Sequence, residues 1–203
     1  MSKITSPSTL NEQVEYNGTY FGDLTWLVSP ETGSKVSYAS ARKKIRSIAF
    51  HLNARGMAPG SKIAVAANNG ISSCLTILGI IYAGHIALPL NLVAGSKIIA
   101  YTLDHSETAL IFTANDCEKL ISEALSDFKK EVEIIKLDSQ LGPIWGKEAP
   151  NETFVKKENV SAEEIAVIMY TSGTTGNPKG VMLSHSNLLA AGRYISSGHE
   201  VDH

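Results

Sequence analysis

The 203-residue sequence is 43% hydrophobic and 19% charged, with 16 Gly and 7 Pro, which is ordinary globular usage and excludes the disordered and collagen-like classes. Its formal net charge of −2 gives no basic footprint for nucleic acid or for an anionic membrane. The two cysteines, Cys74 and Cys117, form neither a disulfide framework nor a zinc-binding spacing, so we expect a reducing, cytoplasmic compartment.

The N-terminal residues predict little regular structure. Residues 1–20 are polar and weakly patterned, and they lack the apolar core of a secretory signal. We therefore expect a loose lead-in over residues 1–24.

A short hairpin and a helix are expected next. Residues 25–28 and 35–38 are typical of two strands around a turn. Apolar residues then recur at helical spacing as far as Leu52, which predicts a helix with Ser37 or Ser40 as its cap.

The central part of the chain alternates between short apolar runs and amphipathic segments. This alternation predicts strands at 62–67, 85–90, 109–113 and 132–137, and helices at 72–83, 97–105 and 117–128. Continuous apolar strands between such helices are typical of a parallel sheet that is covered on both faces. We therefore predict an α/β fold, with an open, mostly parallel sheet and flanking helices.

The longest apolar stretch, from Cys74 to Leu90, is interrupted by glycine, histidine and proline. It falls short of the roughly 20 residues that a membrane span needs. We expect buried core there and no transmembrane segment.

The C-terminal part is predicted to contain a strand, a loop, a second strand and a helix. Residues 139–160 are typical of a connecting loop, and the strand at 165–170 leads directly into a Ser/Thr/Gly segment. A strand at 180–184 leaves that segment, and a helix at 186–195 follows, with Ser184 or Ser186 able to cap it.

The segment from Thr171 to Gly176 carries the chemistry. It places four hydroxyls and two glycines in six residues: Thr171, Ser172, Gly173, Thr174, Thr175 and Gly176. Backbone N–H groups and hydroxyls in such a loop suit a polyanion such as triphosphate, and Lys179 adds a compact positive charge nearby. The spacing is neither a Walker A loop nor a dinucleotide fingerprint. From composition alone, an ordinary surface turn remains open.

The longer string from Met169 to His185 reads Met-Tyr-Thr-Ser-Gly-Thr-Thr-Gly-Asn-Pro-Lys-Gly-Val-Met-Leu-Ser-His. It resembles the phosphate-loop signature of the adenylate-forming superfamily, which includes acyl-CoA ligases, nonribosomal peptide adenylation domains and firefly luciferase. Upstream, the segments 35–39, 52–65 and 79–91 resemble the same family more diffusely.

The resemblance implies a function. Family members activate a small-molecule carboxylic acid with ATP and Mg²⁺ to an acyl-adenylate, and most then transfer the acyl group to a thiol. By resemblance, Thr171 to Gly176 would bind the β- and γ-phosphates, and Lys179 would be the catalytic residue beside them. The residue sequence of the loop, together with Pro-Leu-Asn at 89–91, resembles ligases that use CoA more than peptide synthetase modules. His185 and Asn187 also match common family residues, for which structural hydrogen bonding at a helix start is favoured over catalysis.

The chain also departs from the family. The Thr-Glu motif that helps hold magnesium, the ribose Asp and the adenylating lysine have no counterpart before His203. We therefore expect residues 25–203 to be a partial AMP-binding domain, inactive alone. Alternatives are a non-catalytic binding module, or half of a split enzyme completed by a separate C-terminal part.

Residues 199–203 formally match His-Glu-x-x-His, in which two imidazoles one helical turn apart bind zinc. Because Ser197 and Gly198 precede them and no third ligand follows, we expect no metal site there.

Overall fold

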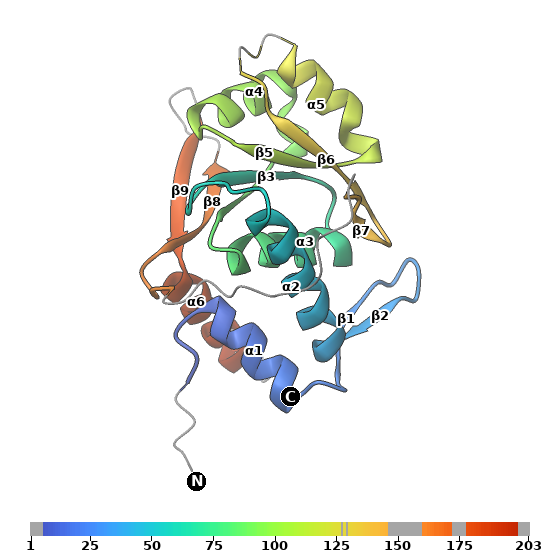
Figure 1. Cartoon of the computed structure of the whole chain (residues 1–203), viewed down its shortest axis with the longest axis vertical. Helices are drawn as coiled ribbons and strands as arrows, with labels where there is room; N and C mark the ends of the chain where they lie inside the picture. The colour runs from blue at the N-terminus through green and yellow to red at the C-terminus, as the bar shows by residue number, and fades with distance from the viewer. Residues whose placement is uncertain (1–5, 127, 129, 146–159, 172–177, 199–203) are drawn as a thin grey trace.

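A mixed β-sheet runs through the computed structural model, which describes residues 6–126, 128, 130–145, 160–171 and 178–198. Seven strands of these residues form it: β3 (Lys62–Ala66), β4 (Ile86–Pro89), β5 (Leu110–Ala114), β6 (Glu133–Asp138), β7 (Gly142–Pro143), β8 (Ile165–Thr171) and β9 (Lys179–Ser184). Their order is β7-β6-β5-β3-β4-β8-β9 (Figure 1).

The strands in the interior of this sheet are parallel. β3 pairs with both β4 and β5, β5 pairs with β6, and β4 pairs with β8, all in parallel register. Only the edge strands β7 and β9 pair antiparallel to their neighbours in the described residues. This confirms the predicted open, mostly parallel sheet.

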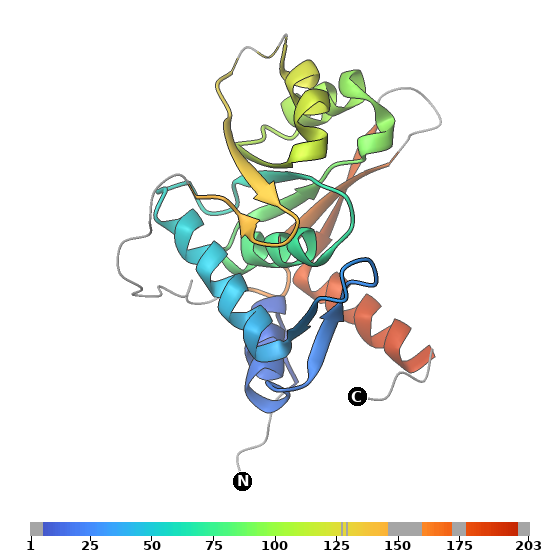
Figure 2. The ribbon, with the colours of Figure 1, turned by 90° about the vertical axis from the view of Figure 1, so that its right-hand side faces the viewer.

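Helices cover both faces of the sheet (Figure 2). α2 (Tyr38–Asn53) and α3 (Ile71–Tyr82) lie on one face, whereas α4 (Ser96–His105) and α5 (Glu118–Leu125) lie on the other. Two single-turn 3₁₀ helices, η1 (Leu92–Ala94) and η2 (Asn115–Cys117), precede α4 and α5. Right-handed crossovers explain the division. The chain moves from β3 to β4 in one direction and from β4 to β5 in the other, so α3 and α4 end on opposite faces.

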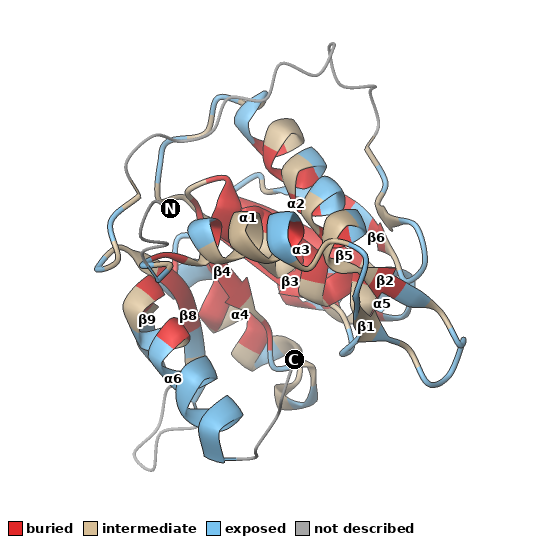
Figure 3. Ribbon diagram, turned by 90° about the horizontal axis from the view of Figure 1, so that it is seen from below, coloured by how far each residue is buried: buried red, intermediate tan, exposed pale blue. Residues whose placement is uncertain are grey.

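The core follows the two-residue period of the strands. Ile63 and Val65 of β3 pack with the α2–α3 side, whereas Ala64 and Ala66 pack with the α4–α5 side. All four are at most 3% exposed. Figure 3 shows the buried residues concentrated in the central strands and on the helix surfaces that meet them.

The early hairpin also forms as predicted. β1 (Thr25–Val28) and β2 (Lys35–Ser37) pair antiparallel, and α2 begins directly after β2. Ser37 is the cap, because its hydroxyl accepts a hydrogen bond from the N–H of Ser40 at 3.3 Å.

The expectation of a loose N-terminal lead-in is wrong for residues 10–20, which form helix α1 (Leu10–Tyr20). The hydroxyl of Thr9 caps it by accepting from the N–H of Glu12 at 3.2 Å. Its buried residues are Asn11 and Gly18. Of its apolar residues, Leu10 and Val14 pack partly buried against the core, which is too short a stripe for the pattern on which the prediction depended.

The expected connecting loop contains one additional element. Residues 142–143, expected within a loop, form the short strand β7 against β6, and residues 146–159 of that loop lie outside the described residues.

The apolar stretch Cys74–Leu90 belongs to α3, the following turn and β4. Among the described helices, none has the length and apolar character needed to cross a membrane.

Candidate functional site

The hairpin formed by β8 and β9 carries the two ends of the candidate phosphate loop. Thr171 is the last residue of β8 and Lys179 is the first of β9, and they face each other as the final pair of the antiparallel ladder. Both residues are exposed. The predicted site residues between them (Ser172, Gly173, Thr174, Thr175 and Gly176) lie outside the described residues. The structure therefore brings together the first and last members of the predicted set.

Lys179 places a positive charge at this end of the hairpin. In the part of the chain that the structure describes, no ion pair engages its ammonium group. Pro178 immediately before it is buried, so the start of β9 is anchored while the lysine side chain remains exposed. An exposed ammonium with no carboxylate partner can interact with an anionic ligand.

The exit from the hairpin is fixed by local hydrogen bonds. Helix α6 (His185–Gly198) begins directly after β9. The side-chain oxygen of Asn187 accepts from the N–H of Ser184 at 3.1 Å, and the Ser184 hydroxyl accepts from the N–H of Asn187 at 3.3 Å. This reciprocal pair is a capping box, with Asn187 in the place usually taken by Glu or Gln. Of the two predicted caps, Ser184 is the one used.

His185 has a structural contact that sequence reasoning did not locate. Its Nδ1 accepts a hydrogen bond from the backbone N–H of Leu10 at 3.2 Å, and the residue is only 3% exposed. A second link joins α6 to the segment before α1, because Arg193 of α6 donates to the carbonyl of Pro7 at 2.7 Å. These contacts support the structural interpretation of His185 and Asn187. No local pattern signals them, since the partners lie more than 170 residues apart.

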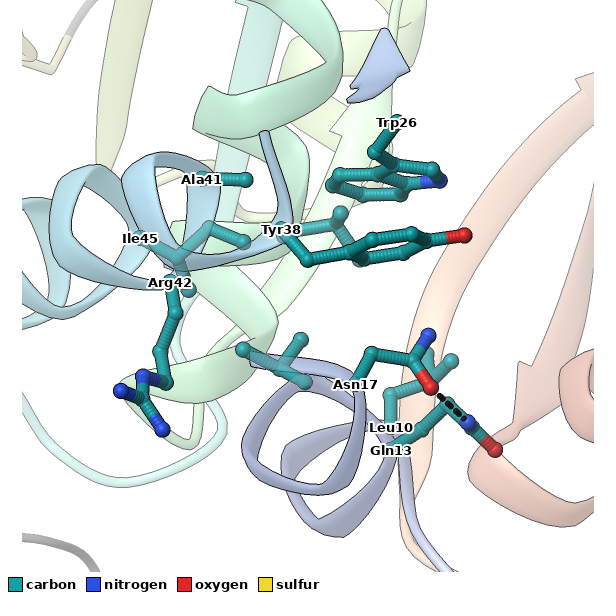
Figure 4. A pocket seen from close by; sticks show the side chains of 10 residues that line it. Leu10, Gln13, Asn17, Trp26, Tyr38, Ala41, Arg42 and Ile45 are labelled. Atoms are coloured by element: carbon teal, nitrogen blue, oxygen red, sulfur yellow. Dashed lines mark hydrogen bonds between the residues drawn. The ribbon is translucent and has the colours of Figure 1, made fainter. Parts of the chain in front are cut away.

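Two cavities lined by described residues lie away from this hairpin. A cavity of about 90 Å³ lies between α1, β1, α2 and α3, where Trp26 stacks on Tyr38 with ring centroids 5.4 Å apart (Figure 4). A wider groove of about 1110 Å³ separates α1 from α6 and shares Leu10, Gln13 and Asn17 with that cavity. Neither lining includes Thr171 or Lys179, so these spaces do not belong to the candidate phosphate site.

Among the described residues, neither the two cysteines nor a metal-ligand cluster offers a competing centre. Burial raises the pKa of the Cys74 thiol, and burial with the charge of Asp116 raises the pKa of Cys117 to about 11. Neither thiol is therefore activated as a nucleophile at neutral pH. Within the described ranges, no three His, Cys, Asp or Glu residues gather as metal ligands. The His-Glu-x-x-His match at 199–203 lies outside those ranges.

Helices cover both faces of a mostly parallel sheet, and a Ser/Thr/Gly segment follows one of its strands, so the chain has an open-sheet α/β fold with a candidate anion-binding loop at a strand end. The chain belongs to the family of AMP-binding enzymes, whose family model matches residues 14–202. The match begins within α1, earlier than the resemblance found in the sequence.

Two curated relatives are CoA ligases. Sulfoacetate–CoA ligase of Cupriavidus necator is 29% identical over 202 residues, which are 98% of this chain and 40% of that enzyme. A 2-succinylbenzoate–CoA ligase of Bacillus cereus is 30% identical over 157 residues, which are 77% of this chain and 29% of that enzyme. The chain therefore spans well under half the length of these relatives.

The fold has solved counterparts. A fatty acyl-adenylate ligase from L. pneumophila, solved with acyl adenylate and pyrophosphate, superposes with a TM-score of 0.79 at 23% identity. The superposition covers 100% of this chain and 35% of that one. At this identity the similarity establishes the fold alone.

Proposed function

We propose that this chain is the phosphate-binding part of an ATP-dependent carboxylic acid–CoA ligase, with Thr171 to Gly176 and Lys179 binding the β- and γ-phosphates of ATP. The observation that supports it most directly is the pairing of Thr171 with Lys179 at the exposed end of the β8–β9 hairpin. This pairing brings a hydroxyl and an ammonium group to the two ends of a segment whose remaining residues supply three more hydroxyls and two glycines.

The proposed role of these groups is electrostatic. Adenylation places negative charge on pyrophosphate as it leaves the α-phosphorus. Donors held in advance around that charge lower the barrier without reorganising during the reaction. Lys179 would contribute the point charge and Thr171 a neutral donor. Neither residue would form a bond to the substrate.

The remaining components of the reaction are assigned by family. We propose that a small-molecule carboxylic acid is the acyl substrate and that CoA is the acceptor, because both relatives described above are named as CoA ligases. Mg²⁺ would neutralise phosphate charge when bound. The described residues hold no group of acidic side chains that fits it, so we assign it no ligands in this chain.

We further propose that the 203 residues bind polyphosphate but do not complete adenylation by themselves. Adenylation requires phosphates, adenosine and carboxylate to be held in line, and orientation of that kind contributes about 7–11 kcal/mol in well-aligned reactions. The chain spans 29–40% of the relatives named above, which supports this partial role. A non-catalytic binding module of the same family differs from this proposal in lacking any acid-dependent chemistry when the remainder of a ligase is supplied.

Equilibrium binding of ATP to the chain tests the phosphate site. We expect weak binding, little preference over GTP, and a loss of affinity at high ionic strength because an exposed charge is screened. Lys179→Ala should weaken this binding. Lys43→Ala is the matched control, since Lys43 is an exposed lysine on α2, distant from the hairpin in sequence and without an ion pair in the described region.

Two results would contradict the proposal. If Lys179→Ala binds ATP as tightly as the unmodified chain, Lys179 is not part of the site. If the chain alone releases pyrophosphate and AMP continuously in the presence of one particular acid, the 203 residues complete an active site and the partial role is wrong.

A further inference from the structure

Three aromatic rings join α4 to the residue that precedes the candidate phosphate loop. Tyr101 stacks on His105 with ring centroids 5.3 Å apart, and His105 meets Tyr170 edge to face at 5.8 Å. The hydroxyl of Tyr170 lies 2.7 Å from Nδ1 of His105, in a hydrogen bond between residues 65 positions apart. The end of β8 is therefore tied to the C-terminal end of α4 at the residue next to Thr171.

The neighbouring strand leaves room for the Tyr170 ring. Tyr170 is paired with Gly180 in the β8–β9 ladder. A Cβ at position 180 would lie 3.3 Å from Cζ of Tyr170 and 3.2 Å from Cγ2 of Ile168, closer than ordinary van der Waals contact. The phenol ring therefore lies against the backbone of β9 at the residue after Lys179, and it contacts both strands of the hairpin.

The imidazole tautomer of His105 decides which group of this bond is the donor. Burial raises the pKa of the Tyr170 phenol, and Tyr101 raises it further. The phenol is therefore protonated at neutral pH and can donate to Nδ1 of a neutral imidazole. The bond leaves the two site residues that the structure describes, Thr171 and Lys179, free for a ligand.

We propose that Tyr170 and His105 are positioning residues for the phosphate site: together they hold the open end of the β8–β9 hairpin against α4, so that Thr171 and Lys179 present their donors at a fixed place. This inference rests on the proposed function, because it requires phosphate to bind at that end. Neither side chain contacts the phosphates in this role. Affinity benefits because a restrained donor loses less freedom on binding than a mobile one.

Amide hydrogen exchange of the full 203-residue chain measures the restraint without any ligand. In Tyr170→Phe and in His105→Ala, peptides that cover residues 165–184 should exchange about two- to tenfold faster, the range in which one neutral hydrogen bond shifts an equilibrium. The double variant should exchange no faster than either single variant, because both changes remove the same bond. His105→Asn keeps a polar atom near the position of Nδ1 and should restore part of the protection.

The affinity for inorganic tripolyphosphate then tests whether the restraint serves the site. The same variants should bind tripolyphosphate about two- to tenfold more weakly, for the same reason. Tyr194→Phe is the matched control, since it removes the same atom from a tyrosine on α6 that is 82% exposed. It should change neither exchange nor affinity.

The outcomes separate this inference from the proposed function. Unchanged exchange in Tyr170→Phe overturns the inference. Faster exchange with unchanged tripolyphosphate affinity also overturns it, because a bond that only stabilises the fold would give that result. If Lys179→Ala weakens binding and Tyr170→Phe does not, the inference fails and the proposed function stands. If the unmodified chain binds no tripolyphosphate, the proposed function fails and the inference fails with it.

Discussion

Glu15 is one of the residues that attach helix α1 to the rest of the molecule, and its removal gives a measurable prediction. Its carboxylate accepts two hydrogen bonds from the Arg46 guanidinium, at 2.8 and 2.7 Å, and one from the Tyr82 hydroxyl at 2.6 Å. Arg42 lies at the limit of ion-pair distance, 3.9 Å away. Glu15→Ala therefore leaves α2 and α3 without their shared acceptor on α1.

The size of the effect follows from the geometry and the exposure. A hydrogen bond to a charged group contributes about 1.5–3 kcal/mol when well protected. Here the Glu15 side chain is 24% exposed and that of Arg46 is 41% exposed, so solvent screens the pair and reduces its contribution. We expect the free energy of unfolding to fall by about 2 kcal/mol for the three bonds together. For a chain of this size that corresponds to about 4–8 °C in Tm.

Urea denaturation with a parallel thermal scan measures this change. Glu123→Ala is the matched control, because Glu123 is an exposed residue of α5 whose side chain has no ion pair or hydrogen bond in the described region. It should change the unfolding free energy by less than about 0.5 kcal/mol. A loss no larger than this in Glu15→Ala would refute the reasoning, since it would mean that the three bonds to Glu15 add nothing measurable to the stability of the fold.

Three further outcomes are expected. Burial and Glu15 raise the pKa of Tyr82 to about 12, which means that the protonated phenol stabilises the folded state. This stabilisation is complete below about pH 10, the pKa of an unfolded tyrosine, and is lost as the pH rises through about 12. The unmodified chain should therefore lose more stability across that range than Tyr82→Phe, and parallel pH curves would contradict the assignment. Gly79→Ala should destabilise the fold by about 1–3 kcal/mol, because the new Cβ would lie 2.5 Å from Cγ2 of Ile48 across the α2–α3 contact. Denaturant titration would measure this loss, and a stabilised variant would mean that the helices move apart at no cost. In a polypeptide with complete adenylation machinery, Lys179→Ala should slow acid-dependent pyrophosphate exchange about a hundred- to a thousandfold, whereas an unchanged rate would remove Lys179 from the reaction.

Sequence patterns predicted the elements that bury apolar residues at a regular period. In α2, Ile45, Ile48 and Leu52 recur at helical spacing, and all three face the core. In β3, a run of small and branched apolar residues matches a strand that is buried on both faces. Periodicity predicts these elements because the positions that face the core are occupied by apolar residues. The sequence patterns also predicted the two strands of the β8–β9 hairpin to within one residue at the ends that face the loop.

The same reasoning failed where contacts are polar or distant. Helix α1 packs through Asn11, whose amide donates to the carbonyl of Tyr82 at 3.1 Å, and through Gly18, which lies against the Arg42 side chain. These contacts add to the partly buried Leu10 and Val14, and a pattern of hydrophobicity contains no record of hydrogen bonds and close approaches. The contact between His105 and Tyr170 is equally invisible, because neither residue has a local signal for the other.

In the candidate site, the residues of the loop and the residues that hold its flanking strands have different tasks. A loop of small hydroxyl residues and glycines supplies donors, yet such residues offer little side-chain packing with which to fix their own position. The position must come from the flanking strands, and those strands are held by groups outside the motif: His105 beside Tyr170 at the entrance, and Leu10 bonded to His185 at the exit. Under the proposed function, the family signature supplies the donors of the loop, whereas the flanking strands are held by residues that the signature does not contain. We therefore expect changes at those residues to weaken phosphate binding while every residue of the motif remains the same.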